Sequence, residues 1–187
     1  PELWDLHTPR LYTAKTSLLV AGKEVERRET RFGVRIIEVT ANAGLRLNGR
    51  RVPLRGVNLH HDLGPLGGAF NRRAAERQLE ILQDMGVNAI RTAHNPPAAE
   101  FLDLCDQRGL LVWDELFDKW NSTADKRADE AFEPFFARHA AALVRRDRNH
   151  PCVFAWSIGN EIGEAPHDPE GLTKEKVASA RQAVLAH

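Results

Sequence analysis

The chain of 187 residues has little cysteine, no net charge and no long hydrophobic run. Its two cysteines, Cys105 and Cys152, cannot build a disulfide framework, and neither has the near neighbours that a structural zinc site needs. Lys+Arg and Asp+Glu both number 26, so no excess of positive charge favours nucleic acid. No stretch approaches the roughly 20 apolar residues of a membrane span. We therefore expect a soluble globular protein that binds neither nucleic acid nor membrane. Its compartment stays undetermined.

The chain also lacks an initiator methionine and a leader, because it opens at Pro1 without a charged and then apolar segment. These absences predict a piece of a longer protein. Residues 1–40 have the Thr, Val, Ile and Leu content of strands, with the turn Ala21-Gly22 between two expected antiparallel strands, 11–20 and 24–39. Asn48-Gly49 predicts a second tight hairpin.

Beyond residue 53 the pattern changes to short apolar runs that alternate with segments of helical period. Four strands are expected at 54–59, 87–93, 110–115 and 153–158. The first helix is expected to begin at Asn71 and end at Gly86, with Ala75, Leu79, Leu82 and Met85 on its buried face. Three further helices are expected to begin near Pro97, near Phe132 and near Thr173. Four strand–helix units predict parallel strands with helices outside them.

Two α/β folds fit this order: an open doubly wound sheet and the first half of an eight-stranded barrel. The first turn is Leu63-Gly64-Pro65-Leu66-Gly67-Gly68, which lacks the G-x-G-x-x-G spacing of a nucleotide-binding sheet. Polar residues instead follow all four expected strands, at 60–62, 91–95, 114–115 and 160–161. Barrel enzymes carry their chemistry at this end of the strands, so the barrel is favoured.

Glu161 is the strongest candidate for a catalytic residue. If the fourth strand continues through Ala155, Ser157, Gly159 and Glu161 on one face, a carboxyl group lies at the mouth of a small-residue face with room for a ligand. Phe154, Trp156 and Ile158 would then pack on the helices. A strand-end Glu in a plain salt bridge is the alternative, and the clustering of polar residues at four strand ends favours the catalytic interpretation.

Other chemistries find less support. His60 and His61 point to opposite faces of a strand, so at most one can face the site, and the H-x-H spacing of a barrel metallohydrolase is absent. No G-x-S-x-G elbow accompanies Ser157. Trp4, Trp113 and Trp156 are expected in the core. For Trp120, stacking on a sugar and shielding a loop are equally good interpretations.

Five motifs in order along the chain resemble glycoside hydrolase family 2, and its β-galactosidases in particular. They are GVNLHHDLG at 56–64, NAIRTAHNPP at 88–97, WDE at 113–115, RDRNHP at 146–151 and WSIGNE at 156–161. Residues 3–12 and 31–35 resemble the last strands of the immunoglobulin-like sandwich that precedes the barrel in that family. The resemblance implies two parts: sandwich strands over 1–40, and the first half of a (β/α)8 TIM barrel over 41–187.

The resemblance also implies a retaining glycosidase that hydrolyses terminal β-linked sugars, most simply galactosides. By it, Glu161 matches the general acid/base and Asn160 the neighbour that holds the sugar 2-hydroxyl. Arg91 matches a positive charge near the nucleophile, and His60 and His94 match ligands to the sugar or transition state. The family's nucleophile is a Glu on the seventh barrel strand, so it is expected beyond His187, and this chain alone is expected to be inactive.

One departure from the family concerns magnesium. Magnesium-dependent members carry a Glu-x-His pair after the third strand, where this chain has Asp118-Lys119-Trp120. We therefore expect no metal and no cofactor, with Asp118 and Trp120 contacting substrate instead. An open half-barrel would expose strand edges, which predicts self-association. The alternatives are a non-catalytic sugar-binding or complementation module and a metal-dependent barrel hydrolase.

Overall fold

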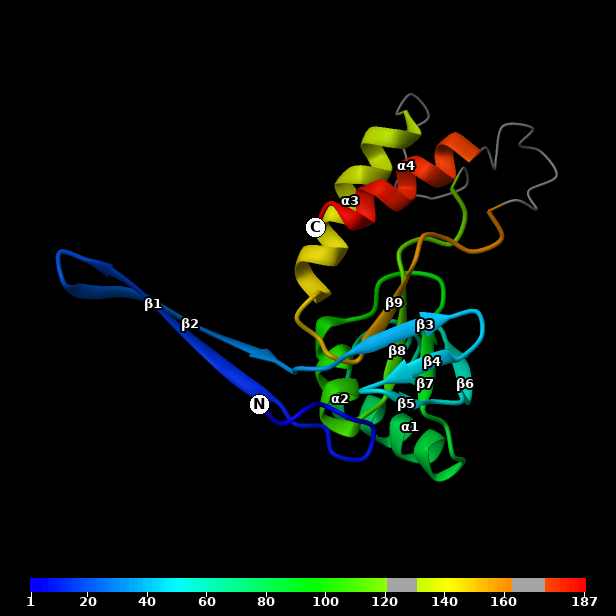
Figure 1. Ribbon diagram of the computed structural model, residues 1–187, viewed down its shortest axis with the longest axis horizontal. Helices are drawn as coiled ribbons and strands as arrows, with labels where there is room; N and C mark the ends of the chain where they lie inside the picture. The colour runs from blue at the N-terminus through cyan, green and yellow to red at the C-terminus, as the bar shows by residue number, and fades with distance from the viewer. Residues whose placement is uncertain (121–130, 163–173) are drawn as a thin grey trace.

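The computed structural model describes residues 1–120, 131–162 and 174–187. The chain begins with a two-stranded hairpin that projects from the rest of the molecule (Figure 1). Its strands are β1 (Tyr12–Val20) and β2 (Lys23–Phe32), which are antiparallel across the predicted Ala21-Gly22 turn. Both turn residues adopt positive φ, 49° and 79°.

The second expected strand, 24–39, is wrong in its extent. β2 ends at Phe32, and Ile37–Thr40 forms a separate strand, β3, in another sheet. A side chain at Gly33 would meet the ring of Pro151 at 2.6 Å, so the backbone passes too close to that ring to continue the hairpin. The guanidinium of Arg35 then donates to the carbonyls of Pro151 and Val153. Close packing against the later part of the chain therefore divides the strand.

A small antiparallel sheet follows, in the order β3-β4-β5, with β4 at Gly44–Leu47 and β5 at Arg50–Arg51. The predicted Asn48-Gly49 hairpin is confirmed, because both residues have the positive φ that such a turn requires, 52° and 77°. The Asn48 side chain also accepts the backbone N–H of Ile36 at 2.9 Å.

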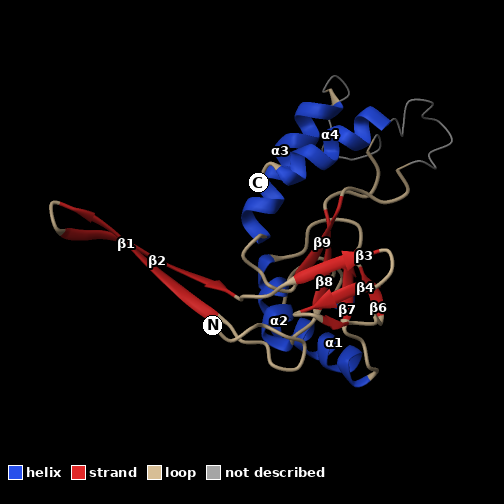
Figure 2. Cartoon of the chain, in the orientation of Figure 1, coloured by secondary structure: helices blue, strands red, loops and turns tan. Residues whose placement is uncertain are grey.

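The largest sheet has four parallel strands in the order β6-β7-β8-β9, as predicted (Figures 1 and 2). The strands are β6 (Gly56–Leu59), β7 (Ala89–Thr92), β8 (Leu111–Glu115) and β9 (Val153–Ser157). They alternate with α1 (Arg72–Asp84), α2 (Ala99–Arg108), α3 (Phe132–Asp147) and α4 (Lys174–Leu185), and a short 3-10 helix, η1, spans Gly64–Leu66. The expected start of the last helix at Thr173 lies outside the described residues.

The ends of α1 and α2 follow local chemistry. Asn71 accepts the backbone N–H three residues further on, and Gly86 follows the helix with φ of 86°. Gly109 ends α2 in the left-handed region, where a Cβ would lie 2.2 Å from the Leu6 carbonyl oxygen. Pro97 was expected in the first turn of α2, but this helix begins two residues later, at Ala99.

Two hydrophobic clusters form the core. One lies between the parallel sheet and the α1 and α2 helices, and the other joins α3, α4 and the segment after β8. Within the described residues, no helix is long and apolar enough to cross a membrane.

Three expected core positions differ from the structure. Met85 is 72% exposed, because it follows the last turn of α1 and leaves the buried face. Trp113 is 43% exposed, and Phe154 packs edge-on against its ring at 6.0 Å as well as against the first hydrophobic cluster. An irregularity in the β8/β9 register, where Val112 pairs with Val153 and Trp113 with Ala155, breaks the alternation that predicted a helix-facing Phe154.

Candidate active site

The parallel register brings the carboxyl ends of β7, β8 and β9 to one edge of the sheet. Asn58, Arg91 and Trp113 are aligned across β6, β7 and β8, and Glu115 is aligned with Ser157. Residues that are far apart in the sequence therefore meet at the edge where barrel enzymes keep their chemistry.

Glu115 is the centre of this edge. Its side chain is fully buried, and its two oxygens accept from Arg91 Nε at 2.8 Å and Nη2 at 3.0 Å. The same carboxylate contacts His94 Nδ1 at 2.7 Å and accepts the Ser157 hydroxyl at 2.7 Å. The backbone N–H of Glu115 donates to the Thr92 hydroxyl at 3.0 Å. A buried carboxylate with this many donors is fixed in place and fixes the donors in turn.

The contact with Glu115 shows which ring nitrogen of His94 carries a proton. A carboxylate only accepts, so the short contact requires a proton on Nδ1. The guanidinium of Arg91, 3.4 Å away, only donates and is therefore no hydrogen-bond partner of that nitrogen. Nε2 is the ring nitrogen left to meet a ligand. The His60 ring lies edge-on to His94, with centroids 5.1 Å apart, whereas His61 contacts the Gly68 carbonyl. Of the two adjacent histidines, His60 therefore faces the site and His61 does not, in agreement with the prediction that at most one can.

The network continues toward Asn160. Arg91 Nη2 donates to Asn160 Oδ1 at 2.8 Å, and Asn160 Nδ2 donates to Asp118 Oδ1 at 2.9 Å. Partial burial raises the pKa of Asp118, but hydrogen bonds from Asn160 and Lys119 outweigh it, so that pKa lies below its usual value. Asp118 is therefore an anion next to the Asn160-Glu161 segment.

Glu161 lies at the same edge, but not on the strand. β9 ends at Ser157, and Glu161 has a φ of 50°, so the predicted continuation of strand alternation as far as Glu161 is wrong. Its carboxylate is 54% exposed and contacts Lys119 Nζ at 3.0 Å. The turn, rather than the strand, therefore directs this side chain.

The sequence allows Trp120 either to stack on a sugar or to shield a loop, and its burial favours the shielding role. The indole is 2% exposed, packs on Phe132 with centroids 4.5 Å apart, and donates from Nε1 to the Ile158 carbonyl at 2.7 Å. It presents no open ring face to a sugar in this structure. Trp120 instead shields and anchors the segment that leads to Glu161.

A divalent cation does not fit this edge. The ammonium of Lys119 lies 3.0 Å from the carboxylates of both Asp118 and Glu161, the place where a cation would need those oxygens. The Glu-x-His pair is absent, and Trp120 offers no ligand atom. We therefore derive no step through a metal.

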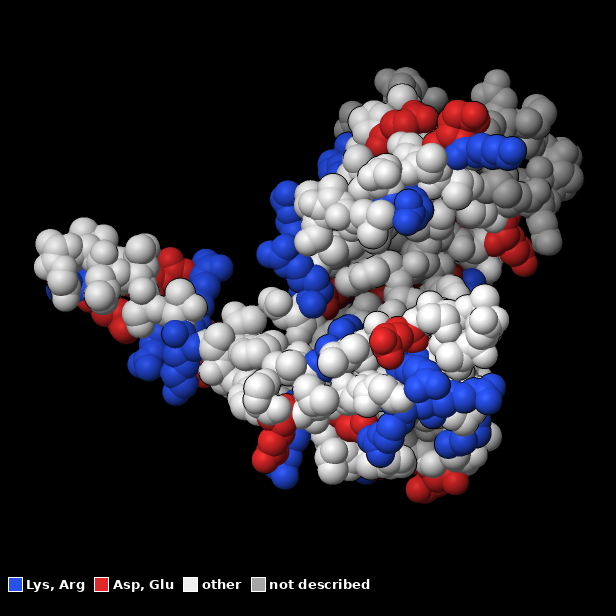
Figure 3. All heavy atoms as spheres, in the orientation of Figure 1, with Lys and Arg blue, Asp and Glu red and all other residues white. Residues whose placement is uncertain are grey.

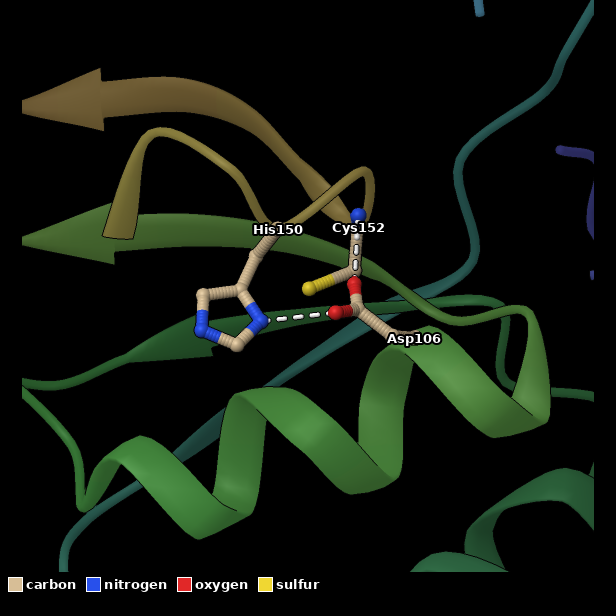
Figure 4. A group of neighbouring side chains, drawn as sticks. All are labelled: Asp106, His150 and Cys152. Atoms are coloured by element: carbon tan, nitrogen blue, oxygen red, sulfur yellow. Dashed lines mark hydrogen bonds and ion pairs between the residues drawn. The ribbon is translucent and has the colours of Figure 1, made fainter. Parts of the chain in front are cut away.

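Another cluster, of Asp106, His150 and Cys152, lies at the opposite end of the sheet (Figure 4). His150 Nδ1 contacts Asp106 Oδ2 at 2.6 Å, and the Cys152 backbone N–H donates to Asp106 Oδ1 at 2.9 Å. Burial raises the pKa of the Cys152 thiol well above its usual value, which disfavours the thiolate that a metal needs. The cluster joins α2 to the turn before β9 and is structural.

Charges of both signs cover the molecular face shown in Figure 3, and basic side chains gather over the β3–β5 sheet. Arg50, on β5, is paired with the buried Asp5. A buried carboxyl group also lies behind the active-site edge. Burial, with the negative charge of Asp147 next to it, raises the pKa of Asp114 to about 8.

The raised pKa of Asp114 predicts that the folding stability of the chain depends on pH. Because its pKa is higher in the folded chain than in the unfolded chain, the proton it holds stabilises the fold at low pH, and this contribution is lost as pH rises from about 4 to about 8. Asp114→Asn should remove this dependence of folding stability on pH. Urea midpoints at pH 5 and pH 8 should differ less for D114N than for the unaltered protein. D84N, at the exposed end of α1, is the control, and an unchanged dependence on pH in D114N would contradict the assignment.

The structure brings six of the seven candidate residues into contact with one another or with a shared partner, and it places Trp120 behind them. Two residues of the site were not among the candidates. In the sequence, Glu115 is recognisable only as a polar residue at the end of a strand. No sequence pattern marks Lys119 beyond its place between Asp118 and Trp120. Their importance depends on contacts with β7 and with the turn after β9.

Two domain families match the sequence. Residues 37–178 match "Glycosyl hydrolases family 2, TIM barrel domain", and residues 1–35 match "Glycosyl hydrolases family 2". Among curated relatives, beta-galactosidase BoGH2A of Bacteroides ovatus is 47% identical over 175 residues, which cover 92% of this chain and 20% of the relative. A beta-glucuronidase of Bacteroides fragilis is 34% identical over 186 residues, covering 97% of this chain and 27% of the relative.

Solved structures agree with these matches. A glycosyl hydrolase family 2 member from Bacteroides cellulosilyticus superimposes with a TM-score of 0.82 at 38% identity, covering 98% of this chain and 23% of the other. The beta-glucuronidase of Parabacteroides merdae gives a TM-score of 0.81 at 31% identity, covering 98% and 22%. The chain thus spans only about a fifth to a quarter of the length of these relatives. Its parallel sheet and helices match part of a TIM barrel that antiparallel strands precede.

Proposed function

The chain belongs to glycosyl hydrolase family 2, and from this premise we propose that it supplies the acid/base side of a retaining β-glycosidase active site. The observation that carries the proposal is the connected edge of Arg91, Glu115, His94 and Asn160, built from three strand ends. Glu161 is joined to this edge through Lys119 and Asp118. A carbohydrate substrate follows from the family.

In this proposal Glu161 is the general acid/base. Its exposed carboxyl group can reach a glycosidic oxygen, donate a proton as the C–O bond breaks, and later take a proton from the attacking water. Asn160, held between Arg91 and Asp118, would bind the sugar 2-hydroxyl. His94 Nε2 and the neighbouring His60 would contact further sugar hydroxyls. Arg91 would place a positive charge beside the second carboxylate.

The second carboxylate, the nucleophile, is proposed to come from another part of a longer protein, since the relatives are four to five times as long. The proposed division of the chain remains sandwich strands over 1–40 and barrel over 41–187. Self-association through the outer strands β6 and β9 also remains a prediction.

We propose a β-galactoside as the substrate because the relative at 47% identity is a beta-galactosidase. The beta-glucuronidase relatives make a β-glucuronide the second candidate. The full-length protein should be assayed with aryl β-galactoside and aryl β-glucuronide, with NMR detection of the first anomer released. We expect the β-anomer of galactose, and no turnover by residues 1–187 alone. Release of the α-anomer, or turnover by the isolated chain, would contradict the proposal.

A further inference from the structure

Two loops at the active-site edge are joined by several contacts. The loop after β8 carries Asp118, Lys119 and Trp120, and the loop after β9 carries Ile158, Asn160 and Glu161. Asp118 accepts from Asn160 through both its backbone and its side chain, and Trp120 donates to Ile158. A fourth contact is made by the ammonium of Lys119, which lies 3.0 Å from Asp118 Oδ1 and 3.0 Å from Glu161 Oε2. The first three contacts hold the backbone and Asn160, and the fourth holds the carboxylate of Glu161.

Glu161 needs such a contact. It lies in a turn with positive φ, and over half of its side chain faces solvent, so packing alone does not select one orientation. A general acid must place its proton within hydrogen-bond reach of the glycosidic oxygen. An ammonium group held by Asp118 offers a fixed donor that selects a single orientation of the carboxylate.

We propose that Lys119 is a positioning residue that orients the Glu161 carboxylate for proton transfer, with Asp118 holding the ammonium in place. This inference rests on the proposed role of Glu161 as acid/base. The ammonium bridges two carboxylates and keeps its own proton. The proton that moves passes from Glu161 to the leaving oxygen, and in the second step from water to Glu161.

The Lys119 ammonium is held from two sides. It lies 3.0 Å from the carboxylates of both Asp118 and Glu161, and hydrogen bonds to these two groups raise its pKa, so Lys119 is a cation. His94 is a further titratable group whose charge acts on Asp118, and it belongs to the buried network of Arg91 and Glu115. Removing the charge of Asp118 should therefore loosen the ammonium and impair proton transfer from Glu161 in the same direction as removing Lys119, but by less.

The test uses the full-length enzyme and three variants, K119Q, K119R and D118N. For an alkyl β-glycoside, whose leaving group needs a proton, we expect K119Q to lower kcat by about tenfold. For a dinitrophenyl β-glycoside, whose leaving group departs without one, the first chemical step should change little. We expect D118N to lower the same kcat by less than K119Q does, and K119R to retain most of it, because arginine keeps a charged donor beside Glu161.

K15Q is the matched control, because Lys15 forms an exposed ion pair with Glu29 on the projecting hairpin. K119Q should keep its folding stability, since a half-exposed ion pair contributes little. Equal losses with both leaving groups, or an unchanged kcat for the alkyl glycoside in K119Q, would overturn the role of Lys119. If E161Q retained alkyl-glycoside turnover, the proposed acid/base would fail instead. If K119Q did not fold, D118N and K119R would decide the matter: a loss in D118N confined to the alkyl glycoside, with turnover retained in K119R, supports the role, and equal losses with both leaving groups overturn it.

Discussion

Glu161→Gln is expected to lower kcat for an alkyl β-glycoside by about 10²–10⁴-fold, the usual contribution of a positioned general acid. The amide keeps the size of the side chain and can still contact Lys119, but its N–H protons are not acidic enough to be transferred to the leaving oxygen. The loss should be much smaller for the first step with a dinitrophenyl glycoside, because that leaving group is already stable as an anion. Comparison of the two substrates by pre-steady-state kinetics measures this difference.

Glu133→Gln, in the exposed first turn of α3, is the control for E161Q. It makes the same chemical change away from the edge and should leave both rates unchanged. Sugar binding should survive in E161Q, so the complex with a substrate analogue can be measured by calorimetry. Full alkyl-glycoside turnover in E161Q would show that another residue supplies the proton.

Glu115→Gln is expected to lower the free energy of unfolding by about 2–4 kcal/mol, because it leaves the Arg91 guanidinium partly buried beside a neutral side chain. The new amide NH₂ would also face donors on Arg91 or His94, since the carboxylate it replaces accepts from both. We expect kcat to fall as well, because Arg91 holds Asn160 through the same guanidinium.

Urea unfolding of the full-length protein measures the stability change in E115Q. Glu80→Gln is the matched control, because Glu80 also forms ion pairs with arginine, in its case with Arg73 and Arg108, but on the surface of α1. The surface variant should lose far less stability, since water solvates the charges that remain. Equal effects of E115Q and E80Q would mean that burial of the Glu115 network does not contribute to stability.

The local features of the fold were predictable because each depends on a few neighbouring residues. Asn71 and Gly86 bound α1 through side-chain capping and positive φ, and Asn48-Gly49 forms its turn for similar reasons. The four parallel strands were predictable because each is a short apolar run between helical segments. Their order then placed Arg91, His94 and Asn160 at a common edge.

Features that depend on distant contacts were missed. The division of β2 from β3 depends on Pro151, more than a hundred residues further along the chain, which leaves Gly33 no room for a side chain. The edge-on contact between Trp113 and Phe154 depends on the irregular register between β8 and β9. Periodicity assumes a regular strand, so it cannot anticipate such a shift.

The sequence by itself determined the family, the strand–helix order and the identity of the residues at the active-site edge, because motifs and period are written along the chain. Only the tertiary structure decided how those residues work together. It buried Glu115 between Arg91, His94 and Ser157, turned Trp120 into the core, and placed the Lys119 ammonium between Asp118 and Glu161. The physical reason is that burial and charge pairing depend on which side chains meet across strands, and the spacing of residues along one strand does not contain that information.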